Sequence, residues 1–209
     1  MEQTRQAPDK MLDFAAHDGQ NAAINSIKRF VIVLAGWQSG KTVIGPPWMY
    51  FEIKARGPGD YLIASPTYPL MMKKVLPEFL RLFKTTFKLG EFVGQPKNCF
   101  TFSEAGAKRF FGKAPPEGRV STQIFFGHAG DPDSLESATY KGAWLDEAGQ
   151  NGFKMESWEA IIGRLSIHEG RVLVTTRAAR VAPLIGDEMH LAPPHSREQP
   201  VAHLSDLTA

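Results

Sequence analysis

The sequence predicts an α/β fold with a mainly parallel central sheet. Short apolar runs rich in Val and Ile alternate along the chain with segments whose apolar residues recur at helical spacing. Such alternation is typical of parallel strands connected by helices. The chain has 209 residues, of which 43% are hydrophobic, so it can bury one substantial core. We therefore expect one main domain.

Four short apolar runs are the expected parallel strands. They are Phe30 to Leu34, Tyr61 to Ala64, Gly142 to Leu145 and Arg171 to Thr175. Their length and composition favour buried strands over helices. A short helix over Asn21 to Lys28 is expected to lead into the first run.

Two amphipathic segments predict helices between these strands. Leu70 to Lys84 and Lys154 to Leu165 each place apolar residues three and four positions apart on one face. Pro77 should bend the first of these helices, because proline cannot donate a backbone hydrogen bond.

Residues 88 to 128 interrupt the alternation. Cys99 to Phe102 and Gln123 to Phe126 predict two short strands separated by a basic loop that contains Gly and Pro, so we expect a β-hairpin excursion. Within residues 71 to 120, ten Lys and Arg stand against four Asp and Glu. Two interpretations stay open: a surface that faces a polyanion, or an ordinary solvated surface.

The composition excludes several classes of protein. The single cysteine, Cys99, rules out an internal disulfide framework and a multi-cysteine zinc site, and we expect it to be buried. The polar N-terminus lacks the apolar core of a signal peptide, and no run approaches the roughly 18 apolar residues of a membrane span. The expected organisation is a lead-in over 1–19, a nucleotide-binding domain over 20–176, and a weakly structured Pro- and His-containing tail over 177–209.

A phosphate-binding loop, AGWQSGKT, follows the first predicted strand. Its residues are Ala35, Gly36, Trp37, Gln38, Ser39, Gly40, Lys41 and Thr42. A strand, a glycine-containing loop that ends in Gly-Lys-Thr and a helix together allow backbone N–H groups to surround phosphates. Lys41 would neutralise the β and γ phosphates of ATP, and the Thr42 hydroxyl would ligate Mg²⁺. The alternative is a chance match in a glycine-containing turn.

Two features make this loop a variant. Ala35 occupies the place of the usual first glycine, which is tolerable only if its backbone avoids the glycine-only region. Gly45-Pro46-Pro47 follows shortly after the loop. Because prolines belong in the first turn of a helix or at a break, we expect a short helix after Thr42 that restarts near Trp48.

Adjacent carboxylates complete the predicted nucleotide site. Asp146 and Glu147 directly follow the apolar run that starts at Gly142. Asp146 would complete the metal shell, and Glu147 would orient the water that attacks the γ phosphate. A simple helix start with Asp146 as N-cap is the alternative. With the loop, this pair predicts a three-layer P-loop NTPase fold of the ASCE type.

Taken in order, these segments resemble the ATPase domain of the large terminase subunit of tailed bacteriophages. The supporting segments are Gly19-Gln20, AGWQSGKT, YLIASPTYPL at 61–70, FGHAGDPDSLESATYKGAWLDEAGQ at 126–150 and GRVLVTT at 170–176. The resemblance implies ATP hydrolysis that drives double-stranded DNA into a viral capsid. It also implies a homo-oligomeric ring, contacts with the viral portal and the small terminase subunit, and a location in the cytoplasm of an infected or prophage-carrying bacterium.

The resemblance also assigns roles to individual residues. Gln20 would contact adenine, unless it is an ordinary polar residue that opens a helix. Arg164 would stabilise charge on the transferred phosphate, unless it is a surface charge at a helix C-terminus. Thr175 and Thr176 would begin the motif that couples hydrolysis to movement. The likeness ends at Arg177, and we expect no nuclease domain in this chain.

Two other functions stay open. The chain could be a nucleotide-binding remnant that neither turns over ATP nor moves DNA, as the altered segment after Thr176 suggests. It could also be a helicase-like, DNA-dependent ATPase. DNA-stimulated turnover separates the packaging motor from the remnant, and strand displacement would indicate the helicase.

Overall fold

The structure, a computed structural model, describes residues 16–36, 40–113, 122–135 and 138–177. Most of the predicted lead-in and tail therefore lies outside the described residues. Seven strands form one sheet in the order β1-β7-β6-β2-β5-β4-β3. Their bounds are β1 Phe30–Leu34, β2 Asp60–Ser65, β3 Gly90–Val93, β4 Cys99–Phe102, β5 Gln123–His128, β6 Gly142–Asp146 and β7 Arg171–Thr176. β1, β7, β6, β2 and β5 run parallel, and β4 and β3 are antiparallel additions at one edge. The predicted α/β fold is confirmed.

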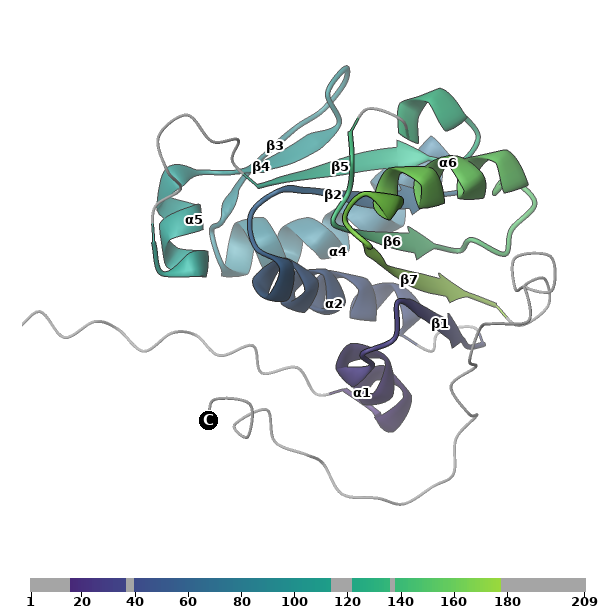
Figure 1. Cartoon of the computed structure of the whole chain (residues 1–209), viewed down its shortest axis with the longest axis horizontal. Coiled ribbons are helices and arrows are strands. Elements are labelled where there is room, and N and C mark those ends of the chain that lie inside the picture. Colours follow the sequence, from purple (N-terminus) through teal and green to yellow (C-terminus); the bar gives the residue numbers. More distant parts are fainter. Residues whose placement is uncertain (1–15, 37–39, 114–121, 136–137, 178–209) are drawn as a thin grey trace, which may run out of the picture.

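Helical segments cover both faces of this sheet (Figure 1). Their bounds are α1 Asp18–Asn25, α2 Lys41–Arg56, α3 Tyr68–Leu70, η1 Met71–Val75, α4 Leu76–Leu80, η2 Arg81–Thr86, α5 Glu104–Phe111, η3 Pro132–Leu135 and α6 Met155–Ser166. One apolar cluster joins the sheet to α2, to the helical run from α3 to η2 and to α5, and a second joins the opposite face to α6. Successive residues of a strand pack into opposite clusters: Trp144 belongs to the first cluster and Ala143 to the second. This alternation produces three layers.

The expected break after the phosphate loop is wrong. α2 runs without interruption from Lys41 to Arg56, with Pro46 and Pro47 inside it. Neither proline can donate a hydrogen bond, so the helix there is maintained by packing. Its side chains Ile44, Trp48, Met49 and Ile53 are all at most 1% exposed. Gly45 lies directly against the ring of Trp144, where an added Cβ would come within 2.0 Å of Cε2.

Two other helices differ from their predicted bounds. α1 begins at Asp18, three residues early, because the Gln20 side chain accepts a hydrogen bond from the backbone N–H of His17 and so caps the first turn. The predicted helix over 70–84 extends from Tyr68 to Thr86 as alternating α and π segments. Wider π turns immediately precede Pro77, which suits a residue whose ring crowds the carbonyl of an ordinary α turn.

The excursion at the sheet edge contains an additional helix. β4 and β5 are antiparallel neighbours as expected, but α5 lies between them in the chain, and the close hairpin is formed by β3 and β4. Ser103 caps α5 by accepting from Gly106 N, and Gly112, with φ of 74°, ends it. Cys99 is 4% exposed, which confirms its expected burial.

Candidate functional site

The phosphate loop connects the end of β1 to the start of α2, at the carboxyl edge of the parallel strands. Gly40, with φ of 73°, is the N-cap of α2, a conformation that favours glycine. The Lys41 ammonium donates to the Gly36 carbonyl (Nζ···O 2.7 Å) and so lies along the loop. Trp37, Gln38 and Ser39 lie outside the described residues. Ala35 has none of the positive φ angles that would require glycine, so it is tolerated here.

Gln20 lies beside this loop. Its Nε2 donates to the Gly40 carbonyl at 3.2 Å, and a Cβ added to Gly40 would come within 2.8 Å of the same nitrogen. The side chain is 6% exposed and therefore links the start of α1 to the start of α2. Gln20 thus borders the predicted phosphate-binding loop, and its contact with adenine stays a prediction.

Asp146 and Thr42 come together from segments far apart in the sequence. Thr42 Oγ1 is 3.3 Å from both carboxylate oxygens of Asp146, and the Thr175 hydroxyl donates to Oδ1 at 2.7 Å. In turn, Trp144 Nε1 donates to the Thr175 hydroxyl at 3.0 Å. Asp146 is 2% exposed; it is the last residue of β6 and pairs with Thr175 of the neighbouring strand β7.

Burial raises the pKa of the Asp146 carboxyl from its ordinary value of 3.8 to about 6. The hydrogen bond from Thr175 opposes this shift, the charge of Glu147 adds to it, and Thr42 and Lys41 lower the pKa further. A divalent cation would offset the unfavourable burial of this charge. Among the described residues no group of three or more His, Cys, Asp and Glu could hold a metal. One carboxylate and one hydroxyl suit Mg²⁺, which takes its remaining ligands from phosphates and water.

Glu147 follows Asp146 in a left-handed conformation, with φ of 53°. Its backbone N–H donates to the Thr175 carbonyl at 2.6 Å, and its side chain is largely buried. Oε2 is buried and accepts no hydrogen bond from the part of the chain that the structure describes. Oε1 lies 3.7 Å from Nε of Arg177. The carboxylate is therefore held at the end of the sheet by a tight backbone turn and one cation.

The end of β7 connects the two halves of the site. The Thr176 carbonyl accepts from Ala35 N at 3.1 Å, and the Thr176 hydroxyl accepts from Gly149 N at 2.9 Å. Together with the contacts of Thr175, these hydrogen bonds connect β7 both to the start of the phosphate loop and to the turn that contains Glu147. The predicted coupling role of Thr175 and Thr176 is untested, but both contact the predicted site.

A pocket of about 500 Å³ adjoins Glu147. Its lining mixes polar and apolar surface and comes from three segments at the carboxyl edge: Pro66, Thr67, Glu147, Gly149, Gln150, Asn151, Gly152, Thr176 and Arg177. Pro66 and Thr67 belong to the segment at 61–70 that contributes to the resemblance to terminase ATPase domains. The pocket gives the Glu147 side of the site access from outside.

Arg164 is not brought to this site. It lies in the last turn of α6, and its carbonyl accepts from Tyr140 N, just before β6 begins. That position is at the amino edge of the parallel strands, opposite the phosphate loop. A role for Arg164 in catalysis would therefore have to be played at a neighbouring subunit, and it stays a prediction.

Arg177 is the site residue that sequence reasoning missed. In the sequence, Arg177 is the point where the resemblance to terminase ATPase domains ends. The available signal was its position directly after the last buried residue of β7, because ligands of parallel α/β sheets bind at the carboxyl ends of the strands.

Comparison with known proteins supports the fold. No protein-family model matches the chain, and no curated protein does. The ATPase domain of the large terminase of Thermus phage P74-26 is similar in structure, with a TM-score of 0.56 and 24% identity over 78% of this chain and 65% of that one. The large terminase from a thermophilic bacteriophage gives a TM-score of 0.58 with 13% identity, over 76% of this chain and 38% of that one.

A third structure, that terminase with ATP-γ-S, gives a TM-score of 0.56 with 13% identity over 76% of this chain. At these identities the likeness establishes a shared fold. The chain thus has the fold of large terminase ATPase domains and spans between 37% and 65% of the lengths of these structures. None of the helices in the described ranges is long and apolar enough to cross a membrane.

Proposed function

We propose that this chain hydrolyses ATP and uses the energy to move double-stranded DNA into a viral capsid. One observation carries the proposal. Lys41, Thr42, Asp146 and Glu147, drawn from two distant segments, converge at the carboxyl edge of a sheet with the terminase ATPase fold. This is the arrangement that phosphoryl transfer to water requires.

Each residue has a defined task in the proposed reaction. The loop amides and Lys41 would bind the β and γ phosphates, and Gln20 would border the adenine. Thr42 and Asp146 would hold Mg²⁺, which neutralises charge that develops on the phosphates. Glu147 would orient the attacking water and accept its proton, from a position open to the adjoining pocket.

Coupling to DNA would begin at Thr175 and Thr176. Both residues contact the carboxylate turn, and Thr176 also contacts the loop strand, so a change at either half of the site reaches β7. A ring of subunits, Arg164 acting on a neighbour, and docking to a portal and a small terminase subunit are further parts of the proposal. They derive from the family resemblance.

Steady-state ATP hydrolysis with and without duplex DNA tests this function. We expect DNA to stimulate turnover in the wild type. Glu147→Gln should bind Mg·ATP with unchanged affinity but lose roughly a hundredfold or more in kcat, because it cannot accept a proton. Lys41→Ala should instead lose nucleotide affinity. Turnover that persists in Glu147→Gln would refute the assigned mechanism, and turnover that ignores DNA would refute the motor.

One observation favours a second candidate, a nucleotide-binding protein without turnover. Arg177 lies 3.7 Å from the Glu147 carboxylate and could hold it away from water. Nucleotide binding that is as tight in the wild type as in Glu147→Gln, with no hydrolysis by either, would establish this alternative.

A further inference from the structure

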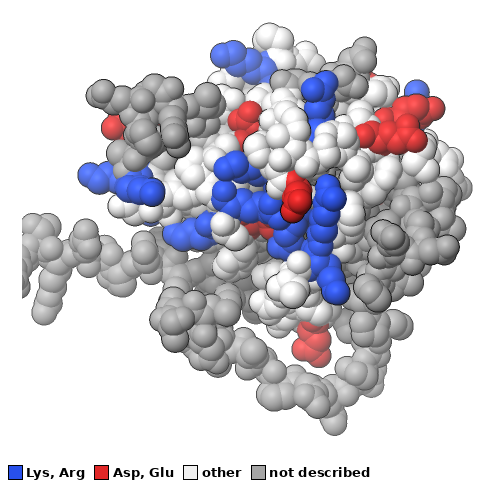
Figure 2. Space-filling view, viewed as in Figure 1, with Lys and Arg blue, Asp and Glu red and all other residues white. Residues whose placement is uncertain are grey.

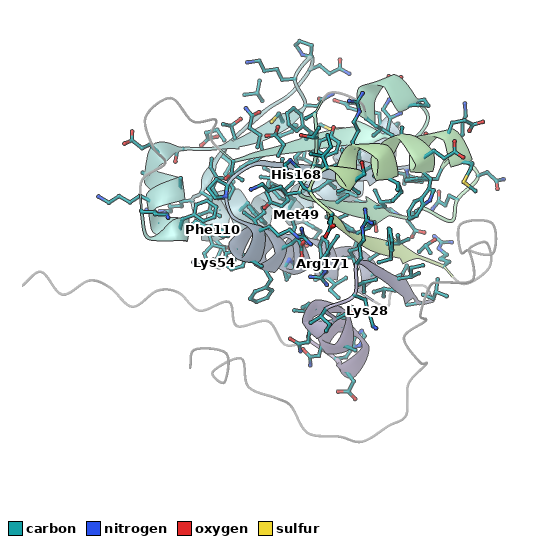
Figure 3. The ribbon with its side chains drawn as sticks, viewed as in Figure 1. Lys28, Met49, Lys54, Phe110, His168 and Arg171 are labelled. Atoms are coloured by element: carbon teal, nitrogen blue, oxygen red, sulfur yellow. The ribbon has the colours of Figure 1, made fainter. Side chains whose placement is uncertain are left out.

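Five cations from separate segments gather at the amino edge of the parallel strands, opposite the nucleotide site. We call this surface the basic edge, and it consists of Lys28, Arg29, Arg56, Lys141 and Arg171. They lie just before β1, in the last turn of α2, just before β6 and at the start of β7. Figure 2 shows blue side chains gathered in the middle of this face, and Figure 3 labels Lys28 and Arg171 on it.

Most of these cations are fixed by backbone carbonyls. Arg171 donates to the carbonyls of Lys28 (2.9 Å) and Ser26, and Arg56 donates to that of His168 (3.1 Å). Lys141 donates to the carbonyls of Arg56 and Pro58, and Arg29 to that of Gly170. A carbonyl orients a cation without cancelling its charge. The basic edge is therefore both ordered and positive.

Few carboxylates oppose this charge. Glu52, 2% exposed, is shared by Arg56 and Arg171, with Nη1 of Arg171 2.8 Å from its Oε2. Asp60 lies near Lys141 and His168, and Glu169 lies in the turn before β7. With Arg164 at the end of α6 added, the edge has six Arg and Lys against these three carboxylates.

The spacing of the edge suits a regular polyanion. β1, β7 and β6 are adjacent, and Arg29, Arg171 and Lys141 stand at their amino ends. Neighbouring strands are about 4.8 Å apart, so these three cations are spread over roughly 10 Å. One strand of duplex DNA presents about three phosphates over that length, at roughly 3.4 Å each.

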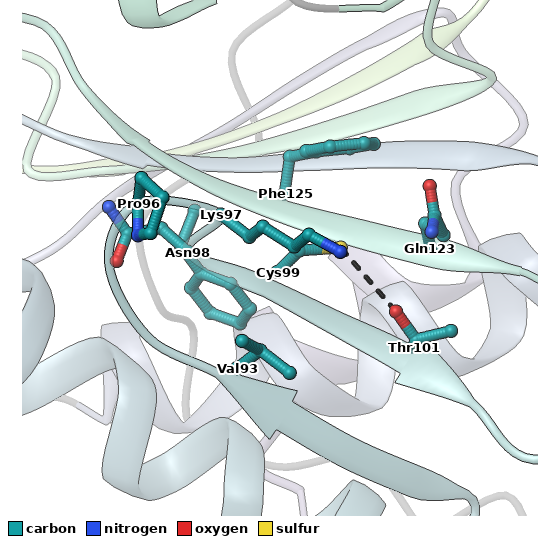
Figure 4. A pocket seen from close by; sticks show the side chains of 9 residues that line it. Val93, Pro96, Lys97, Asn98, Cys99, Thr101, Gln123 and Phe125 are labelled. Atoms are coloured by element: carbon teal, nitrogen blue, oxygen red, sulfur yellow. Dashed lines mark hydrogen bonds between the residues drawn. The ribbon is translucent and has the colours of Figure 1, made fainter.

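The basic run seen in the sequence has a different arrangement. In residues 71–120, Arg81 pairs with Glu78 at 2.7 Å and Lys84 pairs with Glu91, so carboxylates neutralise part of the charge. Lys97 lines a separate hollow of about 510 Å³ near β3 to β5, together with Cys99 and Phe125 (Figure 4). The run is thus spread over several surfaces, whereas the basic edge is assembled only by folding.

We propose that the basic edge binds the phosphate backbone of double-stranded DNA. The choice of duplex DNA rests on the proposed function, but the binding itself requires no ATP turnover. Two exposed isoleucines, Ile27 (91% exposed) and Ile167 (69%), flank the edge. An acidic protein surface is therefore the competing ligand, and the test must distinguish it from duplex DNA.

Fluorescence anisotropy with a labelled 30-base-pair duplex, the full chain and no nucleotide tests the proposal. The variant combines Lys28→Gln, Arg29→Gln and Lys141→Gln, which remove the positive charge and leave a shorter polar side chain with an N–H donor. We expect at least a tenfold rise in Kd at about 100 mM KCl, and a fall of about 2.7 in the slope of log Kd against log[KCl], from 0.9 per lost phosphate contact. Basal ATP hydrolysis and the thermal midpoint should not change.

A matched control removes the same charge elsewhere, by Lys73→Gln, Lys84→Gln and Lys108→Gln. This control should shift Kd by no more than twofold. Equal losses in both triple variants, or a wild type that does not bind the duplex, would overturn the proposal, as would tighter binding of polyglutamate than of DNA. If the basic-edge variant binds DNA as tightly as the wild type and Glu147→Gln abolishes turnover, this inference is refuted and the proposed ATPase stands. If the basic-edge variant loses DNA binding but Glu147→Gln retains turnover, only the proposed ATPase mechanism is refuted.

Discussion

Replacing Asp146 by asparagine should stabilise the protein while it removes a proposed ligand for Mg²⁺. The carboxyl is 2% exposed, and burial raises its pKa from 3.8 to about 6. The folded protein therefore binds this proton more tightly than the unfolded chain does. The free energy of unfolding must fall as pH rises between these two values, and it stays reduced above pH 6.

The size of this effect follows from the shift. At about 1.36 kcal/mol for each pKa unit, ionised Asp146 lowers the stability of the metal-free protein by about 3 kcal/mol. Asparagine keeps the acceptor for the Thr175 hydroxyl but loses the stronger hydrogen bonds of a carboxylate. We therefore expect a net gain of about 1–2 kcal/mol at pH 8, which corresponds to roughly 2–8 °C in the melting midpoint.

Thermal unfolding in EDTA, without nucleotide, from pH 4 to pH 8 measures this gain. The difference between Asp146→Asn and the wild type should approach zero near pH 4 and grow through pH 6. Glu159→Gln, at an exposed position of α6, serves as the control and should show no such dependence. Added Mg·ATP should raise the melting midpoint of the wild type more than that of the variant. A variant that is less stable at pH 8, or a difference independent of pH, would refute the reasoning.

Two further substitutions test packing and positioning. Gly45→Ala should cost about 1–3 kcal/mol in urea unfolding, because its Cβ would meet the Trp144 ring at 2.0 Å. Gly163→Ala in α6, where a Cβ meets nothing within 4 Å, should instead add up to about 1 kcal/mol, and equal effects at the two glycines would contradict the packing account. Arg177→Ala should lower kcat about tenfold with KM for ATP within twofold, because the cation that orients Glu147 is lost. Arg177→Lys should recover part of the loss, whereas a rise in kcat would show that Arg177 restrains Glu147.

The sequence was most informative where structure depends on local pattern. All four apolar runs became strands within one residue of the expected bounds. Asp146, Glu147, Thr175 and Thr176 stand at the carboxyl ends of two of these strands, whereas Arg164 does not. Gly40, Lys41 and Thr42 occupy the start of a helix, as the motif requires. Local pattern sufficed because strand length, apolar composition and loop chemistry are encoded within a few neighbouring residues.

Features that depend on distant residues could not be predicted. β7 pairs with β1 across more than a hundred residues, and its other neighbour is β6. The hydrogen bond of Thr175 to Asp146 joins residues 29 positions apart and depends on this strand order. α2 continues through Pro46 because buried packing outweighs local preference. α5 is a different case, because its two ends are marked locally in the sequence by the capping residues Ser103 and Gly112.

The left-handed backbone of Glu147 has a consequence for mutational drift. Left-handed geometry costs most residues about 1–2 kcal/mol, a penalty that glycine avoids and asparagine reduces. A lineage freed from any need for turnover would gain stability by exchanging this glutamate for either residue. Descendants of such a lineage should therefore show glycine or asparagine at position 147 before they lose the loop, so the order of decay would reveal which function was lost first.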